Sequence, residues 1–282
     1  MRLAAESPGA RLARAALFVA LAGYTAFSAG PLAWAAALSV RSTSAILDAP
    51  YGFEWPPRFA NYAEAWTVGG YQIYLANSLG ITAVAVALLL LVGGLAAHAI
   101  ALYRFPLRRS VIAVLAVAIF FPPQATIFGL FQVLAASGLY DTRIGLCLAY
   151  VALQLPMTVL MLSVLFARVP RAYYDAARLD TCREIDLPFA VTFPLAVPAL
   201  VTVAILNAVI LWNDLLLAVV LIADDARRTL PLGVLRFMGD HQTDVAMLAT
   251  GVMISVLPVL LAYAAASERI IRSVALPMRG GA

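Results

Sequence analysis

The chain has 282 residues, of which 63% are hydrophobic and only 12% are charged. Soluble domains carry about 25% charged residues, so this composition indicates an integral membrane protein. Lysine is absent; the 19 basic residues are all arginine, and they exceed the 15 acids to give a net charge of +4. Without lysine, the chain cannot form a Walker A phosphate loop or a lysine Schiff base. The arginines cluster beside apolar stretches, which is typical of membrane orientation rather than of nucleic-acid binding.

Windows without charged residues predict six membrane-spanning helices. The first, Ala15–Val40, has 26 residues and would be about 39 Å long as a helix, more than the roughly 30 Å of a bilayer core. A cleaved signal peptide is the alternative, but its apolar run is usually about 7–15 residues, so an uncleaved anchor is favoured. The other spans are expected at Ile73–Leu102, Val111–Leu134, Ile144–Phe166, Val191–Ile222 and Val245–Ser267. Prolines should bend several of them: Pro122, Pro123, Pro156, Pro194, Pro198 and Pro258.

The arginines also predict an orientation. If the N-terminus is cytoplasmic, the segments on that side hold 13 of the 19 arginines and the opposite segments hold 6. Cytoplasmic loops of membrane proteins carry the excess of basic residues. We therefore expect both termini and the segment between the fourth and fifth spans to be cytoplasmic, and residues 41–72 to contain an extracytoplasmic loop.

The longest polar stretch, Pro170–Pro198, lies between the fourth and fifth spans. Its charged residues are Arg171, Arg178, Arg183, Asp175, Asp180, Glu184 and Asp186. Pro170 suits the first position of a short helix, whose apolar face would carry Ala172, Ala176 and Leu179. Because alanines let another surface approach the backbone closely, the stretch is interpreted as a docking element. An ordinary amphipathic helix that lies on lipid headgroups is the alternative.

The spacing in this stretch resembles the cytoplasmic EAA loop of importer-type ABC transporter permeases, which reads Glu-Ala-Ala, three residues, Gly, nine residues, Ile-x-Leu-Pro. Asp175, Ala176 and Ala177 stand for Glu-Ala-Ala, and Pro194 is the final proline. Arg178, Leu179 and Asp180 fill the gap, and Thr181 replaces the glycine. A glycine there can take a left-handed conformation that ends the helix, which β-branched threonine adopts poorly.

Further stretches resemble the carbohydrate-uptake branch of that family, the maltose-type, MalG-like permeases. They cover about residues 73–276 and include Asn77-Ser78-Leu79, Phe121-Pro122-Pro123-Gln124, Gly138-Leu139-Tyr140-Asp141-Thr142, Leu211-Trp212-Asn213-Asp214 and Thr229-Leu230-Pro231-Leu232-Gly233. The resemblance implies an all-α polytopic membrane protein with six transmembrane helices and a type I ABC importer permease fold. It divides the chain into residues 1–72 (first helix and loop), 73–268 (permease core, with its coupling loop at 168–190) and 269–282 (a cytoplasmic tail).

The resemblance also implies a function. The chain would be a non-catalytic permease subunit that moves a sugar across the cytoplasmic membrane of a bacterium by alternating access. Its partners would be a second homologous permease, two copies of an ABC ATPase and an extracytoplasmic substrate-binding protein. No cofactor is expected in this chain, because ATP and magnesium would bind the ATPase. Glycerol 3-phosphate or another polar solute is the alternative substrate.

A few polar residues within or between the spans are candidates for the translocation path. Asp214, next to Asn213, would be energetically costly inside a membrane unless it faced a cavity or a partner. A structural contact near the end of the span is favoured over a role in the path. Asn77 is a second candidate for the path, but Asn77 and Asn207 more often serve as packing contacts between helices. Asp240, His241 and Asp244 could form a weak metal site, but a solvated loop is favoured, and no metal is expected.

Two functions of other classes are alternatives. An ion-coupled secondary transporter that works alone would need buried ionisable groups in several spans, whereas Asp214 is the only clear case. A membrane-embedded enzyme would need a cluster of histidines or acids near one interface, which the sequence lacks.

Overall fold

The computed structural model of the chain describes residues 8–238 and 243–275. The chain is mostly helical (78%), and the described residues contain no β-strand. This follows from the apolar composition, because a segment surrounded by lipid must satisfy its backbone hydrogen bonds internally, which a helix does. By contacts within the chain, the structure divides into two compact units.

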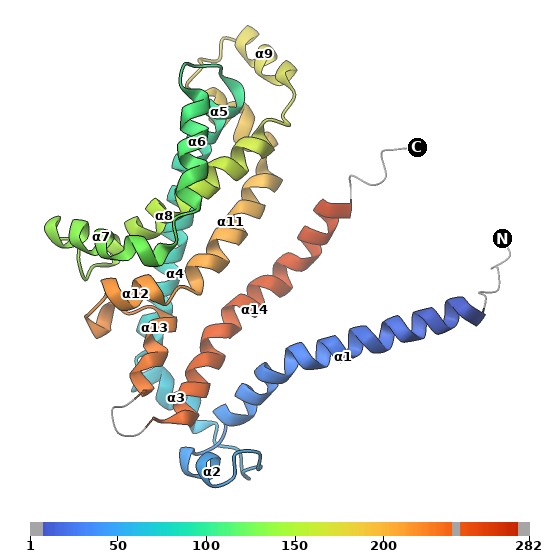
Figure 1. Cartoon of the computed structure of the whole chain (residues 1–282), viewed down its shortest axis with the longest axis vertical. Helices are drawn as coiled ribbons and strands as arrows, with labels where there is room; N and C mark the ends of the chain where they lie inside the picture. Colours follow the sequence, from blue (N-terminus) through green and yellow to red (C-terminus); the bar gives the residue numbers. More distant parts are fainter. Residues whose placement is uncertain (1–7, 239–242, 276–282) are drawn as a thin grey trace. The chain divides into compact units, whose positions relative to one another are not determined.

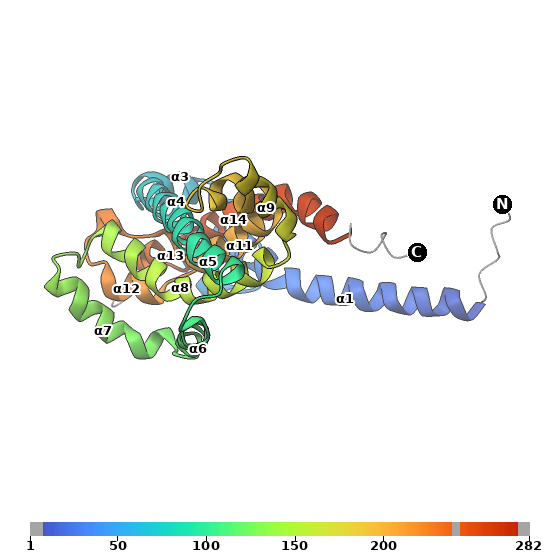
Figure 2. The ribbon, with the colours of Figure 1, turned by 90° about the horizontal axis from the view of Figure 1, so that it is seen from above.

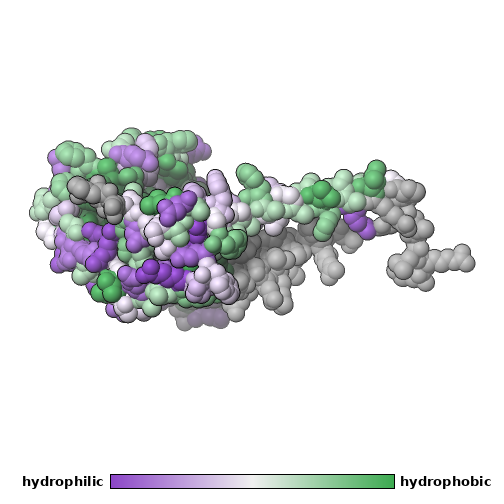
Figure 3. Space-filling model, turned by 90° about the horizontal axis from the view of Figure 1, so that it is seen from below, coloured by the Kyte–Doolittle hydropathy of each residue, from purple (hydrophilic) through white to green (hydrophobic). Residues whose placement is uncertain are grey.

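The first unit contains the residues up to Gly69 together with Val234–Leu257. Its helices are α1 (Pro8–Ser39), α2 (Thr43–Asp48), α3 (Ala60–Thr67) and the first part of α14 (Val245–Ala275). The Thr250 hydroxyl donates a hydrogen bond to the carbonyl oxygen of Ser39 at 3.0 Å and so joins α14 to the end of α1. Hydrophobic residues run along the described part of α1 in the space-filling view (Figure 3).

The second unit contains Gly70–Gly233, together with residues from Pro258 onward. Its helices are α4 (Tyr71–Leu88), α5 (Gly94–Leu102), α6 (Arg108–Ile119), α7 (Pro123–Ala136), α8 (Arg143–Phe166), α9 (Arg171–Leu179), α10 (Phe193–Leu195), α11 (Val197–Trp212), α12 (Leu216–Leu221) and α13 (Leu230–Val234). A π-helical turn (Leu89–Gly93) joins α4 to α5, and another (Pro188–Thr192) leads into α10. Within this unit α9 lies at one end, and α12 and α13 lie toward the other (Figure 1).

Three of the expected spans are continuous helices of sufficient length and apolarity to cross a membrane. These are Leu12–Ser39, Tyr71–Leu102 and Arg143–Phe166, which match the first, second and fourth predicted spans. The number becomes five if each of two bent helix pairs is a single span. The sixth predicted span begins in α14, whose apolar part Val245–Leu261 is shorter, so the structure does not establish the count of six.

The third and fifth predicted spans are not single straight helices. The third is divided into α6 and α7, which are bent by 102°, because Pro122 is extended (φ −66°, ψ 137°) and Pro123 starts a new helix. The fifth bends by 75° beside Ala196, between α10 and α11, where Pro194 and Pro198 remove backbone donors. It then breaks again before α12. Proline chemistry in the sequence indicated bends at these places but not their angles.

The core of the second unit lies around α8, which packs against α4, α5, α6 and α11 (Figures 1 and 2). One cluster of buried side chains joins α5, α8 and α11: Ala97, Ile100, Val159, Leu162, Phe166, Ala196 and Val203. The alanines in this cluster let the helix backbones approach closely, which is the usual packing mode of membrane helices. This core holds the end of α8 and the end of α5 together, and four residues separate the end of α8 from the start of α9.

Candidate functional site: the α9 loop

The polar stretch between α8 and α11, residues 168–190, forms a short helix on a closed loop, which we call the α9 loop. Pro170 is extended (ψ 135°) and caps the helix rather than occupying its first position, which is Arg171. The helix ends at Leu179, and Thr181 has a positive φ of 63°. The left-handed conformation that a glycine would favour is therefore present at Thr181, although threonine adopts it at a cost.

The end of α9 is a Schellman motif. The backbone N–H of Thr181 donates to the carbonyl of Arg178 at 3.2 Å, and that of Cys182 donates to the carbonyl of Ala177 at 3.0 Å. Both bonds satisfy carbonyl groups that the end of a helix otherwise leaves unpaired. Ala177 and Cys182 also pack against the same small core, which is the apolar contact that accompanies this motif.

The inner face of α9 is held by Tyr174. This side chain is buried and packs with Leu187 and Val191. Its hydroxyl lies 3.0 Å from the hydroxyl of Thr192, which in turn lies 2.7 Å from Nδ1 of His98 in α5. The helix is thus joined through one buried polar chain to the end of α5 and to the turn that precedes α10. Tyr174 was not among the predicted docking residues, although its place opposite the three predicted apolar residues could have indicated an anchor.

A charged cluster fixes the side of the loop. Arg178 donates to Glu184 at 2.7 Å and to Asp175 at 3.1 Å, and Tyr103, just after α5, donates to Glu184 at 2.5 Å. The hydrogen bonds from Arg178 and then Tyr103 hold the pKa of Glu184 below its usual value. Partial burial and the bond to Glu184 raise the pKa of Tyr103 to about 12. Tyr103 therefore remains a neutral donor and Glu184 a carboxylate at neutral pH.

The opposite face of α9 is free. Ala172, Ala176 and Leu179, the three residues predicted to form an apolar face, are all exposed, and Leu179 is 85% exposed. The nearby Tyr173 and Ile185 are also exposed. Apolar side chains that stay in contact with solvent while the rest of the loop is packed are typical of an interaction surface.

The structure gathers most of the predicted coupling residues on α9 and its cap. Asp175, Ala176 and Leu179 are exposed, whereas Ala177 is half-buried on the inner face. Arg178 and Thr181 hold the loop rather than its free face, and Asp180 is the exposed cap residue. Pro194 is exposed in α10, outside the α9 loop.

The three predicted path residues have separate surroundings. Asp214 accepts hydrogen bonds from the Tyr150 hydroxyl at 3.0 Å and from the backbone N–H of Ala218 at 3.3 Å, within the first turns of α12. Asn213 is exposed at the end of α11, and its amide donates to the carbonyl of Val209. The buried Asn77 uses its amide to bind the loop before α13. Each has at least one structural contact, and only Asn213 is freely exposed.

Asn207 joins α11 to α8 through Thr158, at 3.1 Å between Nδ2 and Oγ1. It is thus a packing contact between helices.

The structure describes only part of the disfavoured metal site. Of its three residues, Asp240 and His241 lie outside the described residues. The remaining member, Asp244, accepts from the backbone N–H of Met247 at 3.0 Å and from the hydroxyl of Thr43. Its carboxylate is thus used at the start of α14.

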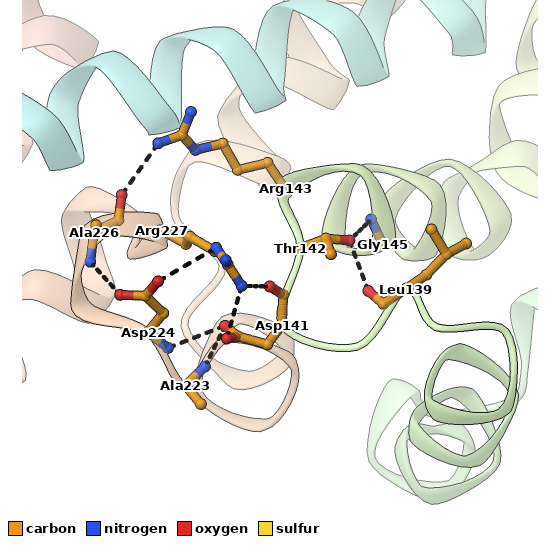
Figure 4. A network of polar contacts seen from close by, with 9 residues as sticks. All are labelled: Leu139, Asp141, Thr142, Arg143, Gly145, Ala223, Asp224, Ala226 and Arg227. Carbon is orange, nitrogen blue, oxygen red and sulfur yellow. Dashed lines mark hydrogen bonds and ion pairs between the residues drawn. The ribbon is translucent and has the colours of Figure 1, made fainter.

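A second polar cluster lies near the start of α4 and joins the turn before α8 to the loop after α12. We call it the Asp141 joint (Figure 4). The Asp141 carboxylate accepts hydrogen bonds from the backbone N–H groups of Ala223 at 2.9 Å and Asp224 at 3.0 Å, and it pairs with the Arg227 guanidinium at 2.9 Å. Although partial burial opposes ionisation, these donors hold the pKa of Asp141 below its usual value.

Asn77 and Tyr74 of α4 complete this region. The Asn77 amide donates to the carbonyls of Ala226 at 3.0 Å and Arg228 at 2.8 Å, and the Tyr74 hydroxyl donates to Asp225 at 2.8 Å. The Asp141 joint and the α9 loop therefore lie toward opposite ends of the 32-residue helix Tyr71–Leu102, which is about 48 Å long.

These features define a class of protein: a membrane-embedded helical subunit with a short polar helix displayed between two of its membrane helices. Comparison with known proteins gives the family. A family model described as "binding-protein-dependent transport system inner membrane component" matches residues 89–272, and the chain belongs to this family of transporter permease subunits.

The chain is similar to permeases of carbohydrate uptake. It is 35% identical over 246 residues to the diacetylchitobiose uptake system permease protein NgcG of Streptomyces coelicolor, covering 86% of this chain and 82% of NgcG. It is 32% identical over 243 residues to the trehalose transport system permease protein SugB of Mycobacterium tuberculosis, covering 86% of this chain and 88% of SugB.

A solved structure has the same fold. It is the crystal structure of a bacterial ABC transporter involved in the import of the acidic polysaccharide alginate, one chain of which matches with a TM-score of 0.81 at 20% identity, covering 93% of this chain and 98% of that chain. The predicted all-α importer permease fold and the predicted relation to carbohydrate-uptake permeases are thereby confirmed.

Proposed function

We propose that this chain is one permease subunit of an ATP-driven ABC importer of a sugar in a bacterial cytoplasmic membrane. It would pair with a second homologous permease, two copies of an ATPase and an extracytoplasmic binding protein. Sugar is favoured over glycerol 3-phosphate because two relatives that match most of the chain are named for diacetylchitobiose and trehalose. An ion-coupled transporter that works alone does not fit a family whose members are components of binding-protein-dependent transport systems.

The observation that carries the proposal is the free apolar face of α9 on a rigidly held loop. Ala172, Ala176 and Leu179 would enter a groove of the ATPase, and the exposed Asp175 and Asp180 would lie at its edge. Small residues suit this role because they allow close approach of the two backbones. The side of the membrane follows from the arginine excess, which would place the α9 loop and both termini in the cytoplasm.

Movement of the ATPase would reach the membrane helices through the inner face of the loop. A displacement of α9 pulls on Tyr174, and the Tyr174–Thr192–His98 chain passes it to the helices on either side. Because packed interfaces switch between discrete arrangements rather than deforming continuously, this contact can tilt α5 and the α10–α11 pair together. Alternating access would follow, with ATP and magnesium bound to the ATPase only.

Among the path candidates, exposed Asn213 is the one that we assign to contact with sugar hydroxyls, while Asp214 and Asn77 position the helices around it.

Charge reversal on the α9 face tests the docking role. An Asp175→Ala/Ala176→Arg variant, expressed with the companion permease and ATPase, should insert in the membrane but lose the ATPase on purification and lose sugar-stimulated ATP hydrolysis. A Val68→Arg variant is the matched control, because it also adds an arginine at an exposed apolar position but leaves the α9 loop unchanged. Full ATPase retention by the α9 variant would overturn the assignment.

Two further measurements test the remaining parts of the proposal. In a Cys147→Ala background, Cys182 is the single thiol of this chain, and a membrane-impermeant thiol reagent should label it only from the cytoplasmic side.

The second measurement tests the substrate. ATP hydrolysis by the complex with its binding protein should rise with one or a few members of a panel of disaccharides and glycosides. Ion-driven uptake by the chain alone would reject the importer.

A further inference from the structure

The segment that follows α1 has its apolar side chains on the outside. Between Leu47 and Phe59, the side chains of five large apolar residues are mostly exposed, and Phe53 is 99% and Trp55 88% exposed. The five are Leu47, Tyr51, Phe53, Trp55 and Phe59. Leaving such side chains in water forfeits the free energy that their burial would release, so this surface needs an apolar neighbour.

Polar side chains of the same segment are turned inward. Arg41 is buried, and its guanidinium donates to the carbonyls of Ala45 and Ala49, both at 2.7 Å. The Glu54 carboxylate accepts from the backbone N–H of Ser42 at 2.6 Å. The buried Asn61 donates to the carbonyls of Ser39 and Arg41. This loop is therefore inverted relative to a loop that faces only water, which exposes its charges and covers its aromatic rings.

One ring contact gives the level of the loop relative to the membrane helix. Tyr51 packs on Trp34, with ring centroids 5.2 Å apart and planes tilted by 38°. Trp34 lies within the span Leu12–Ser39, five residues before its end, which is about 7.5 Å along the helix axis. The loop thus folds back beside the last turns of a membrane helix instead of extending away from it.

We propose that residues Leu47–Phe59 form a membrane-interface anchor whose aromatic side chains insert among the lipid headgroups of the adjacent leaflet. Tyrosine and tryptophan prefer this zone because their rings are apolar and their hydroxyl or indole N–H still reaches water. The two exposed charges of the segment, Asp48 and Arg58, have opposite signs and suit the polar side of the same zone. The anchor would fix the height and rotation of α1. This inference does not depend on the substrate or on the ATPase.

The fluorescence of Trp55 tests the anchor. Replacing Trp34, Trp66 and Trp212 by phenylalanine leaves Trp55 as the single tryptophan and preserves an aromatic ring against Tyr51. The full-length chain, without other subunits that would add tryptophans, is then reconstituted in phosphatidylcholine and phosphatidylglycerol vesicles that contain lipids brominated near the headgroup. We expect blue-shifted emission, strong quenching by brominated lipid and weak quenching by aqueous iodide.

Two further reporters keep the test decisive. Phe53→Trp in a background without other tryptophans should behave like Trp55, so a defect in one variant does not end the experiment. Tyr173→Trp on α9 is the control, which brominated lipid should not quench. Quenching of Trp55 and of the Phe53→Trp reporter by iodide but not by lipid would overturn the anchor. So would shielding from both quenchers that appears only after the binding protein or a sugar is added, because the surface would then serve a protein or a ligand.

Discussion

The Asp141 joint and the α9 loop are two polar regions toward opposite ends of the helix Tyr71–Leu102, and they use their charges differently. The side chain of Asp141 is 21% exposed, and the hydrogen bonds of its carboxylate end within the chain, on two backbone N–H groups and one arginine. The α9 loop satisfies its inner face through Tyr174 but leaves its outer face unoccupied. The first region closes a connection between segments, whereas the second holds a surface ready for a partner.

The two regions also contain the same unusual backbone conformation in different residue types. Asp141 has φ 53° and Thr181 has φ 63°. Aspartate tolerates the left-handed region because its short polar side chain can bond locally, whereas a β-branched side chain crowds its own backbone there. The joint therefore uses a residue suited to its conformation, and the α9 loop carries a strained one.

The largest effect is expected from removing the inner anchor of the α9 loop. Tyr174→Ala leaves a cavity in the cluster with Leu187 and Val191 and should cost about 3–5 kcal/mol of stability. Trypsin should then cleave after Arg178 and Arg183 much faster in the full-length chain purified without its ATPase. Tyr173→Ala is the matched control, since the neighbouring aromatic ring is exposed and its loss should leave cleavage unchanged. Equal cleavage in both variants would show that α9 is not held from the inside.

A smaller loss is expected at the joint. Asp141→Ala removes the acceptor of two backbone N–H groups and the partner of Arg227, and should cost about 2 kcal/mol in the free energy of unfolding. Asp141→Asn keeps an acceptor oxygen and tolerates a positive φ, so it should lose about half as much. Thermal unfolding of the purified transporter measures both. If both variants matched the wild type, the cluster would not be a structural joint.

The comparison of the two left-handed residues predicts changes of opposite sign. Thr181→Gly relieves the strain of the α9 cap and, after allowing for the more flexible unfolded chain, should stabilise the loop by about 0.5–1 kcal/mol. Asp141→Gly fits the same conformation but loses the carboxylate, so it should destabilise. The unfolding midpoints of the two variants decide this, and a Thr181→Gly variant less stable than wild type would show that the threonine side chain makes a needed contact.

The smallest predicted effect is a dependence on pH. The folded-state pKa of Asp141 lies below its ordinary value of 3.8. The contribution of its carboxylate to the stability of the fold is therefore fully present above about pH 4 and is lost as the pH falls through the folded-state pKa. The stability difference between wild type and Asp141→Asn should therefore shrink in that acidic range. The pKa of Glu184 is also lowered, but its side chain is 56% exposed and screened by solvent. Glu184→Gln should therefore change the pH dependence of stability less than Asp141→Asn does. A larger change for Glu184→Gln would reverse the comparison.

Much of this protein could be predicted from local sequence. The absence of charge over long windows located the continuous helices Leu12–Ser39, Tyr71–Leu102 and Arg143–Phe166 to within a few residues. The alternation of alanines and charges located α9 and its free face, because helical periodicity is a local property. The bends of 102° and 75° were not predictable, since a proline permits a bend but neighbouring helices set its direction.

Composition and local spacing were enough to establish the membrane class, the main helices and the loop with an exposed apolar face, since each depends on residues within one segment. Which polar residues face inward was set by long-range packing. Tyr174 and His98 meet at Thr192, Asn77 binds a loop about 150 residues later, and Arg41 turns away from the aromatic residues that follow it. These contacts join positions far apart in the chain or depend on the path of a loop, and side-chain burial is set by the whole packed structure rather than by neighbouring residues.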